Sequence, residues 1–135
     1  MDDGVVPSQA GTHRKVTDQA SEGLLSPLLR NARIKAILPC LRGNVLDVGC
    51  GSGALANHVA QGNYTGVEID EESLAICRQT YPGHNFLSEL PSPAEKFDTI
   101  ISLAVIEHVK SPDIFLQDLA VRLRSIAVSP ANFTR

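Results

Sequence analysis

Three glycines at alternate positions follow a short apolar run, and this arrangement constrains the fold more than any other part of the sequence. The stretch Val45–Gly53 reads VLDVGCGSG, and its apolar start suits a buried strand. Glycine lets a backbone turn tightly and lets a ligand approach without meeting a Cβ atom. Apolar residues at helical spacing follow over 53–61, which predicts a helix whose first turn directs free N–H groups outwards. In an open α/β sheet, ligands bind at such a strand–loop–helix junction.

An acidic residue follows this loop at a spacing typical of nucleoside-binding sites. Glu68 lies 19 residues after Gly49, at the end of the second predicted strand. A carboxylate at that position can accept hydrogen bonds from both hydroxyls of a ribose. Loop and acid together therefore predict a site for a nucleoside-containing cofactor. Two other interpretations of the loop stay open: a plain strand-to-helix turn, and the dinucleotide fingerprint of NAD-binding proteins, which Gly49, Gly51 and Ala54 also satisfy.

The rest of the chain alternates between short apolar runs and segments of helical periodicity. We expect strands at 44–48, 64–69, 84–87 and 97–103, and the beginning of a fifth at 126–128. We expect helices from Ser26 to 38, at 53–61, at 71–80 and after Ser111 and Pro112. Such alternation produces parallel β-α-β units joined by right-handed crossovers. The predicted fold class is therefore α/β, a Rossmann-like, doubly wound and mostly parallel sheet.

Composition excludes several classes of protein. The chain has 135 residues, of which 43% are hydrophobic and 20% charged, and its net charge is -3. These values suit one globular domain and make a nucleic-acid partner bound through bulk charge less favoured. The sequence contains neither an apolar run of membrane-spanning length nor the pattern of a signal peptide, so we expect a cytoplasmic protein without a membrane partner. The three cysteines and four histidines have no metal-ligand spacing, so no metal is predicted.

Residues 1–20 lack periodicity and are expected to form a flexible tail, which leaves 21–135 as the domain. Three segments of that domain together resemble the class I S-adenosylmethionine-dependent methyltransferases, in particular the type 11/12 group that includes the ubiquinone and menaquinone enzymes. Residues 45–53 are similar to the first motif of the family, 66–70 to its acidic second strand, and 97–109 to its fourth strand and the loop that follows. Asp47 stands where NAD fingerprints usually carry an apolar residue, which favours the methyltransferases.

The resemblance implies a binding site for S-adenosylmethionine and a role for each matching residue. The backbone of the glycine loop would lie against the methionine part, Asp47 would orient the amino end, and Glu68 would hold the ribose hydroxyls. The loop residues in question are Gly49, Cys50, Gly51 and Gly53, with Cys50 present as a small side chain. Ile69 would pack on the adenine, and Ser88 or Glu89 would recognise its amino group. Leu103 and Ala104 would lie beside the methyl donor.

Methyl transfer from a sulfonium requires little chemistry from the protein, because the cofactor supplies the reactive carbon. The protein must mainly hold donor and acceptor in line. A base is needed only where the acceptor loses a proton, and His108 and Glu107, directly after the fourth predicted strand, are the candidates. The same pair also fits a role in orienting the loop or simply facing solvent.

The expected function is therefore an S-adenosylmethionine-dependent methyltransferase that acts on a small molecule. Two alternatives stay open: a non-catalytic module or remnant that binds S-adenosylmethionine, and, less favoured, a fragment of an NAD-binding oxidoreductase. The sheet of the family has seven strands, whereas this sequence ends seven residues after Val128, so we expect the last strands to be absent. A strand left at a sheet edge exposes unpaired backbone groups. That edge predicts a homodimer.

Overall fold

A computed structural model describes residues 27–103 and 105–124 of the chain. The chain divides into two units between residues 36 and 37, and each is described by itself. An α-helix occupies 27–37 and gives way to a single 3₁₀ turn at Leu38–Cys40, which contains Pro39. The predicted end of this helix is confirmed, since a residue that precedes proline disfavours the helical conformation. The predicted tail at 1–20 and the helix start at Ser26 lie outside the described residues.

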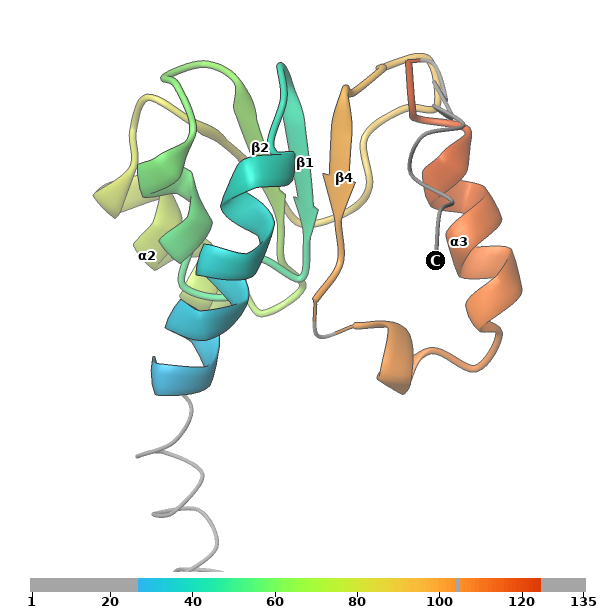
Figure 1. The fold of residues 1–135 in the computed structure, drawn as a ribbon, viewed down its shortest axis with the longest axis horizontal. Coiled ribbons are helices and arrows are strands. Elements are labelled where there is room, and N and C mark those ends of the chain that lie inside the picture. The colour runs from blue at the N-terminus through green and yellow to red at the C-terminus, as the bar shows by residue number, and fades with distance from the viewer. Residues whose placement is uncertain (1–26, 104, 125–135) are drawn as a thin grey trace, which may run out of the picture. The chain divides into compact units, whose positions relative to one another are not determined.

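The second unit is built on four parallel strands in the order β3-β2-β1-β4. Their bounds are Val45–Val48 for β1, Tyr64–Val67 for β2, Asn85–Leu87 for β3 and Thr99–Ile101 for β4. The chain runs outwards from β1 to β3 and then returns to the other side of β1. Figure 1 shows β1 between β2 and β4. The strand order therefore reverses between β1 and β4, and ligands of open α/β sheets bind beyond the carboxyl ends of the strands at such a point. The predicted α/β class and parallel sheet are confirmed.

Alternate residues of the strands pack on opposite faces of the sheet. Leu46, Val48 and Val67 form one buried cluster with Phe97 and with Leu119 of α3, which spans Pro112–Ala120. The other face carries Tyr64 and Phe86, and the ring of Phe86 lies 6.1 Å from that of Tyr81, the residue that follows the helix Glu71–Thr80. Both faces of the sheet thus carry buried apolar side chains, as expected of a parallel sheet.

Helix α2 spans Glu71–Thr80 and begins as the sequence predicts. The carboxylate of Asp70 accepts a hydrogen bond from the backbone N–H of Ser73 at 2.9 Å, which is the usual geometry of a helix N-cap. Within α2, the side chains of Leu74 and Cys77 are buried. Helix α3 begins at Pro112 as predicted, but the side chain of Ser111 makes no capping hydrogen bond.

The helix predicted at 53–61 is wrong, because the structure has only a short 3₁₀ helix at Ala54–His58. Gly53 precedes it in a left-handed conformation and offers no capping side chain, and Val59 is already extended. The apolar residues that suggested a helix are buried, since Leu55 and Ala56 are 4% and 1% exposed. The spacing of these residues thus predicted their burial correctly but not the type of helix, because five residues are too few for an α-helix of ordinary length. The expected helix N-terminus therefore does not contribute to a ligand site.

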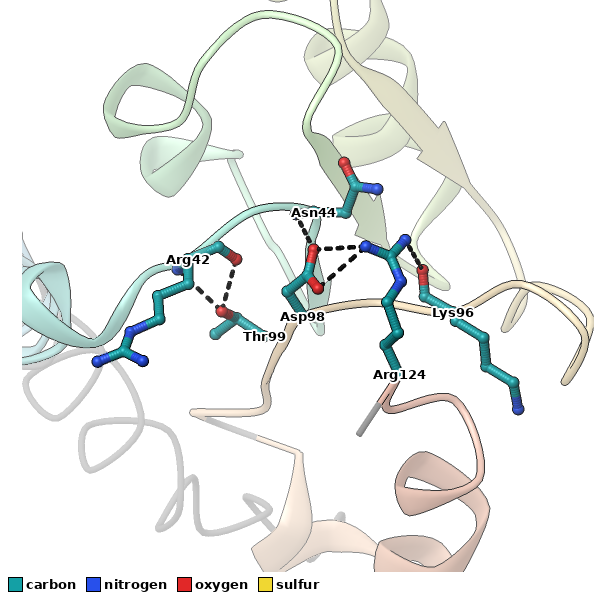
Figure 2. Close-up of polar contacts among 6 residues, drawn as sticks. All are labelled: Arg42, Asn44, Lys96, Asp98, Thr99 and Arg124. Carbon is teal, nitrogen blue, oxygen red and sulfur yellow. Dashed lines mark hydrogen bonds and ion pairs between the residues drawn. The ribbon is translucent and has the colours of Figure 1, made fainter. Parts of the chain in front are cut away.

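Polar groups join the amino ends of β1 and β4 (Figure 2). The carboxylate of Asp98 accepts hydrogen bonds from the backbone N–H of Asn44 at 2.8 Å and from the guanidinium of Arg124 at 3.0 and 3.1 Å. The hydroxyl of Thr99 donates to the carbonyl of Arg42 at 2.9 Å and accepts from its N–H at 3.0 Å. These contacts tie the start of β4 both to the chain before β1 and to the segment that follows α3.

The residues that follow α3 lie beside the start of β4, where a fifth strand would be expected. Phe97 and Leu123 form a parallel bridge, in which the N–H of Phe97 donates to the carbonyl of Arg122 at 2.8 Å. The fifth strand predicted at 126–128 lies outside the described residues. Over the described ranges, none of the helices has the length and apolar character that crossing a membrane requires.

Candidate functional site

The loop after β1 is held by left-handed glycines whose surroundings differ. Gly49, Gly51 and Gly53 have φ angles of +79°, +54° and +74°, a region that favours glycine. A Cβ atom at Gly49 would collide with Cγ2 of Val105, whereas one at Gly51 would meet nothing within 4 Å. Gly49 is therefore required by the segment after β4, which lies against it. Gly51 is the glycine that leaves open space for a ligand.

Glu68 follows β2 directly and connects two backbone segments. Its Oε2 accepts a hydrogen bond from the N–H of Gly51 at 2.9 Å, and its Oε1 accepts one from the N–H of Asp70 at 3.1 Å. An ionised carboxylate has about four lone-pair positions, so two more hydrogen bonds can be accepted without loss of these two. The acid predicted from spacing therefore lies at the glycine loop and retains acceptor capacity.

A second carboxylate lies beneath the same loop. Asp47 of β1 is 7% exposed, and its Oδ2 accepts a hydrogen bond from the hydroxyl of Tyr64 at 2.7 Å. Gly66 is the register partner of Asp47 on β2, and with no side chain of its own it leaves room for this diagonal contact. Burial raises the pKa of Asp47, the Tyr64 hydrogen bond lowers it, and the negative charge of Glu68 raises it; the net result is a pKa of about 6.

Two thiols lie at the loop, Cys50 within it and Cys77 on α2. The thiol of Cys77 donates to the carbonyl of Gly51 at 3.1 Å, and a Cβ atom at Gly66 would lie only 2.8 Å from the sulfur of Cys50. Burial raises the pKa of both thiols, so both are protonated at neutral pH. This environment agrees with the expectation that Cys50 is a small packing side chain.

Apolar side chains are exposed beyond the strands that flank β1. Ile69, after β2, is 86% exposed, and Leu103, after β4, is 41% exposed. Between β4 and Leu103, the buried hydroxyl of Ser102 has no hydrogen-bond partner among the described residues. The exposed isoleucine and the unpaired hydroxyl both follow the carboxyl ends of their strands, at the same edge of the sheet as the glycine loop.

The remaining predicted site residues lie on the segments that follow β3 and β4. Ser88 and Glu89 are exposed directly after β3. His108 is exposed in the 3₁₀ turn Ile106–His108, which also contains the backbone of Glu107. Ala104 lies outside the described residues. Over the described ranges, no three His, Cys, Asp or Glu side chains are grouped so that they could hold a metal ion.

The sequence interpretation missed Tyr64, Ser102 and Val105. A signal for Tyr64 was present, because Asp47 is a charged residue within an apolar strand and a buried carboxylate needs a partner. Alternation places Asp47 on the same face as every second residue of the neighbouring strand, which includes Tyr64. The contact between Val105 and Gly49 had no comparable signal, because it depends on the path of the chain after β4.

Comparison with known proteins agrees with this geometry. The chain matches the model of the methyltransferase-domain family over residues 18–126. It is 34% identical over 109 residues to a tRNA U34 carboxymethyltransferase of Alteromonas mediterranea. The aligned region covers 68% of this chain and 33% of that protein. It is 32% identical over 106 residues to a ubiquinone biosynthesis O-methyltransferase of Agrobacterium fabrum, which covers 70% of this chain and 41% of that protein. The chain thus spans well under half the length of these relatives.

Solved structures share the fold. The plantazolicin methyltransferase BpumL, solved in complex with SAH, superposes with a TM-score of 0.64 at 19% identity, over 78% of this chain and 47% of that chain. DesVI of Streptomyces venezuelae superposes with a TM-score of 0.59 at 22% identity, over 78% of this chain and 53% of that chain. The alternative of an NAD-binding oxidoreductase is not favoured by these matches. The match to the family over most of the chain, together with the glycine loop and the acid that binds it, places the chain in the methyltransferase-domain family of S-adenosylmethionine-dependent enzymes.

Proposed function

We propose that the chain binds S-adenosylmethionine at the carboxyl ends of β1, β2 and β4 and transfers its methyl group to a small-molecule acceptor. The observation that carries this proposal is the hydrogen bond from Gly51 to Glu68, which places an acid with spare acceptor capacity beside an open glycine. The family match supports the choice of cofactor.

The charges and surfaces of the site suit this cofactor. S-adenosylmethionine carries a sulfonium, an ammonium and one carboxylate, so its net charge is positive. Asp47 and Glu68 place two carboxylates around one loop, close enough that the charge of Glu68 raises the pKa of Asp47. Complementary charge of this kind favours a cationic ligand. The exposed apolar side chains of Ile69 and Leu103 suit the adenine and the carbon chain.

Each site residue has a proposed task. Glu68 accepts hydrogen bonds from the ribose hydroxyls, and Asp47 attracts the amino end of the methionine part. The backbone at Gly51 approaches the ligand, whereas Gly49 and Gly53 shape the loop around Val105 and Cys77. The other residues in the proposed cofactor site are Cys50, Ile69, Ser88, Glu89, Leu103 and Ala104.

The chemistry needs few protein groups. S-adenosylmethionine supplies an electrophilic methyl carbon, which forms a bond to the acceptor while its bond to sulfur breaks and the electron pair goes to sulfur. The residues of the chain hold the donor in line with the acceptor, an arrangement that can be worth roughly 7–11 kcal/mol of the barrier. Where the acceptor must lose a proton, His108 or Glu107 accepts it.

The acceptor is the least constrained part of the proposal. The names of the relatives cover tRNA, ubiquinone biosynthesis and fatty acids. A net charge of -3 argues for a small molecule over a polyanion.

We further propose a cytoplasmic location and the pairing of two copies of the chain at the outer edge of β4. Among the described residues, the pairing on that side of β4 is one bridge, from Phe97 to Leu123. Light scattering over a wide concentration range tests that pairing, and a monomer throughout contradicts it.

Thermal unfolding with S-adenosylhomocysteine, and separately with NAD, tests the cofactor. A ligand at a hundredfold excess over its dissociation constant adds about 2.7 kcal/mol to the free energy of unfolding, which raises the midpoint by several degrees. We expect this rise with S-adenosylhomocysteine alone. A rise with NAD, or with neither ligand, contradicts the proposal. Transfer of a labelled methyl group to catechol-like phenols and to tRNA, assayed side by side, then separates an enzyme from a binding module and identifies the acceptor class.

A further inference from the structure

Tyr64 is a buried polar residue to which the proposed function so far assigns no task. It is 1% exposed at the first position of β2, and its ring lies 5.4 Å from that of His84 and 5.7 Å from that of Phe86. Packing of this ring needs no hydroxyl, so phenylalanine would fill the same space. The hydroxyl instead donates to Oδ2 of Asp47 at 2.7 Å, a short hydrogen bond to a carboxylate.

Apart from Tyr64, the groups around Asp47 either disfavour its ionised form or carry no charge that affects it. Glu68, which follows β2, adds a like charge. Cys50 of the loop and Cys77 of α2 are both neutral thiols at physiological pH. The ring of His84 meets the ring of Tyr64 edge to face. Among the side chains that affect Asp47, that of Tyr64 is the one that favours its ionised form.

We propose that Tyr64 is a positioning residue for the cofactor, because its hydroxyl orients Asp47 beneath the glycine loop and keeps it ionised. The proposal rests on the proposed function in one respect, namely that Asp47 attracts the amino end of S-adenosylmethionine. The hydroxyl takes one oxygen of Asp47 and so determines how the carboxylate is rotated. Tyr64 acts through Asp47 and has no contact with the reacting atoms.

Removal of the hydroxyl should displace the pH dependence of binding and, because the carboxylate of Asp47 is then no longer held in one rotation, should also weaken binding slightly at high pH. The pKa of Asp47 is about 6 with the hydrogen bond present, so affinity for the cofactor should fall as the pH drops through that value. Tyr64→Phe should move this midpoint up by about one pH unit, since a hydrogen bond to a charged group is lost. Such a shift makes binding about fivefold weaker near pH 6, in addition to the small loss that remains near pH 9, where Asp47 is ionised in both proteins.

Calorimetric titration of S-adenosylhomocysteine between about pH 5 and about pH 9 is the decisive measurement. Tyr81→Phe is the matched control, because its hydroxyl accepts a hydrogen bond from Asn57 at 3.2 Å on the exposed surface. We expect the wild type and Tyr81→Phe to share one profile and Tyr64→Phe to be displaced. Identical profiles for all three overturn the proposal, and so does an equal loss of affinity by Tyr64→Phe at every pH, which is the signature of altered packing.

A ligand-free measurement separates this inference from the function on which it rests. The ¹³C resonance of the Asp47 carboxyl should titrate near pH 6 in the wild type and at higher pH in Tyr64→Phe. Equal titration midpoints overturn the link between Tyr64 and Asp47, whatever the protein binds. A displaced midpoint in a wild-type chain that binds no S-adenosylhomocysteine overturns the cofactor role while the link itself stands. In an Asp47→Asn background, Tyr64→Phe should no longer change the pH dependence of binding.

Discussion

The backbone N–H of Gly51 donates a hydrogen bond of 2.9 Å to Oε2 of Glu68, and this bond joins positions 17 residues apart at the carboxyl ends of β1 and β2. The other oxygen of Glu68 accepts from the N–H of Asp70, the residue that caps α2. One side chain therefore sets the loop after β1 relative to the helix after β2. The acid has a structural task in addition to its proposed task in ligand binding.

Glu68→Gln should lower the affinity for S-adenosylhomocysteine strongly, with only a modest loss of stability. The amide can still accept one of the two backbone hydrogen bonds, so we expect a cost of about 1–2 kcal/mol in the free energy of unfolding. The rise in melting temperature with ligand should disappear. Glu71→Gln is the control, since Glu71 is an exposed acid in the first turn of α2. An undiminished ligand-induced rise in Glu68→Gln would falsify the assignment of the ribose site.

Gly49→Ala and Gly62→Ala should differ in cost although both replace a left-handed glycine. Their φ angles are +79° and +84°, but a Cβ atom collides with Val105 at Gly49 and meets nothing within 4 Å at Gly62. Backbone strain alone should cost Gly62→Ala about 1–2 kcal/mol. Gly49→Ala should cost about 3 kcal/mol or more and weaken ligand binding, because the segment after β4 must move. Urea unfolding measures both, and equal costs would show that Val105 yields freely.

Asp47→Asn should stabilise the ligand-free protein above pH 6 while it weakens cofactor binding. The pKa of Asp47 is raised from its ordinary 3.8 to about 6, so between these values the native state binds more protons than the unfolded state. Native stability therefore falls as the pH rises through this window, by about 3 kcal/mol in total from this one group. The neutral amide removes that loss. The difference in unfolding free energy between variant and wild type should grow from about pH 4 to about pH 6, and a constant difference contradicts the assignment.

The polar contacts at the amino ends of β1 and β4 should affect stability without affecting the ligand (Figure 2). Asp98→Ala removes the acceptor of the Asn44 N–H and the partner of Arg124, so we expect a loss of about 1–2 kcal/mol. Arg124→Gln removes a half-exposed ion pair and a long hydrogen bond of 3.5 Å to the carbonyl of Lys96, and should cost less than about 1 kcal/mol. Both variants should keep wild-type affinity for S-adenosylhomocysteine. Weakened binding at unchanged stability would mean that this end of the sheet communicates with the opposite end.

Short-range patterns were sufficient for the strands and for the acid of the site. The apolar run at β1 and the cap at Asp70 depend on neighbouring residues, and the structure confirms both. The spacing from Gly49 to Glu68 placed the acid correctly because consecutive parallel strands end at the same edge of the sheet. The helix expected at 53–61 failed for a local reason as well, since Gly53 enters it in a left-handed conformation that periodicity does not reveal.

Contacts between segments that are distant in the sequence determined the rest. That Asp47 is buried and bound by Tyr64 depends on the register of β1 with β2. That a side chain at Gly49 would collide with Val105 depends on where the chain runs after β4. The sequence by itself determined the fold class, the family and the residue types of the site, because glycine spacing and strand alternation are local properties. Only the tertiary structure decided which glycine is open, which carboxylate is buried and which hydroxyl orients it, because each depends on the atoms that other segments bring to that position.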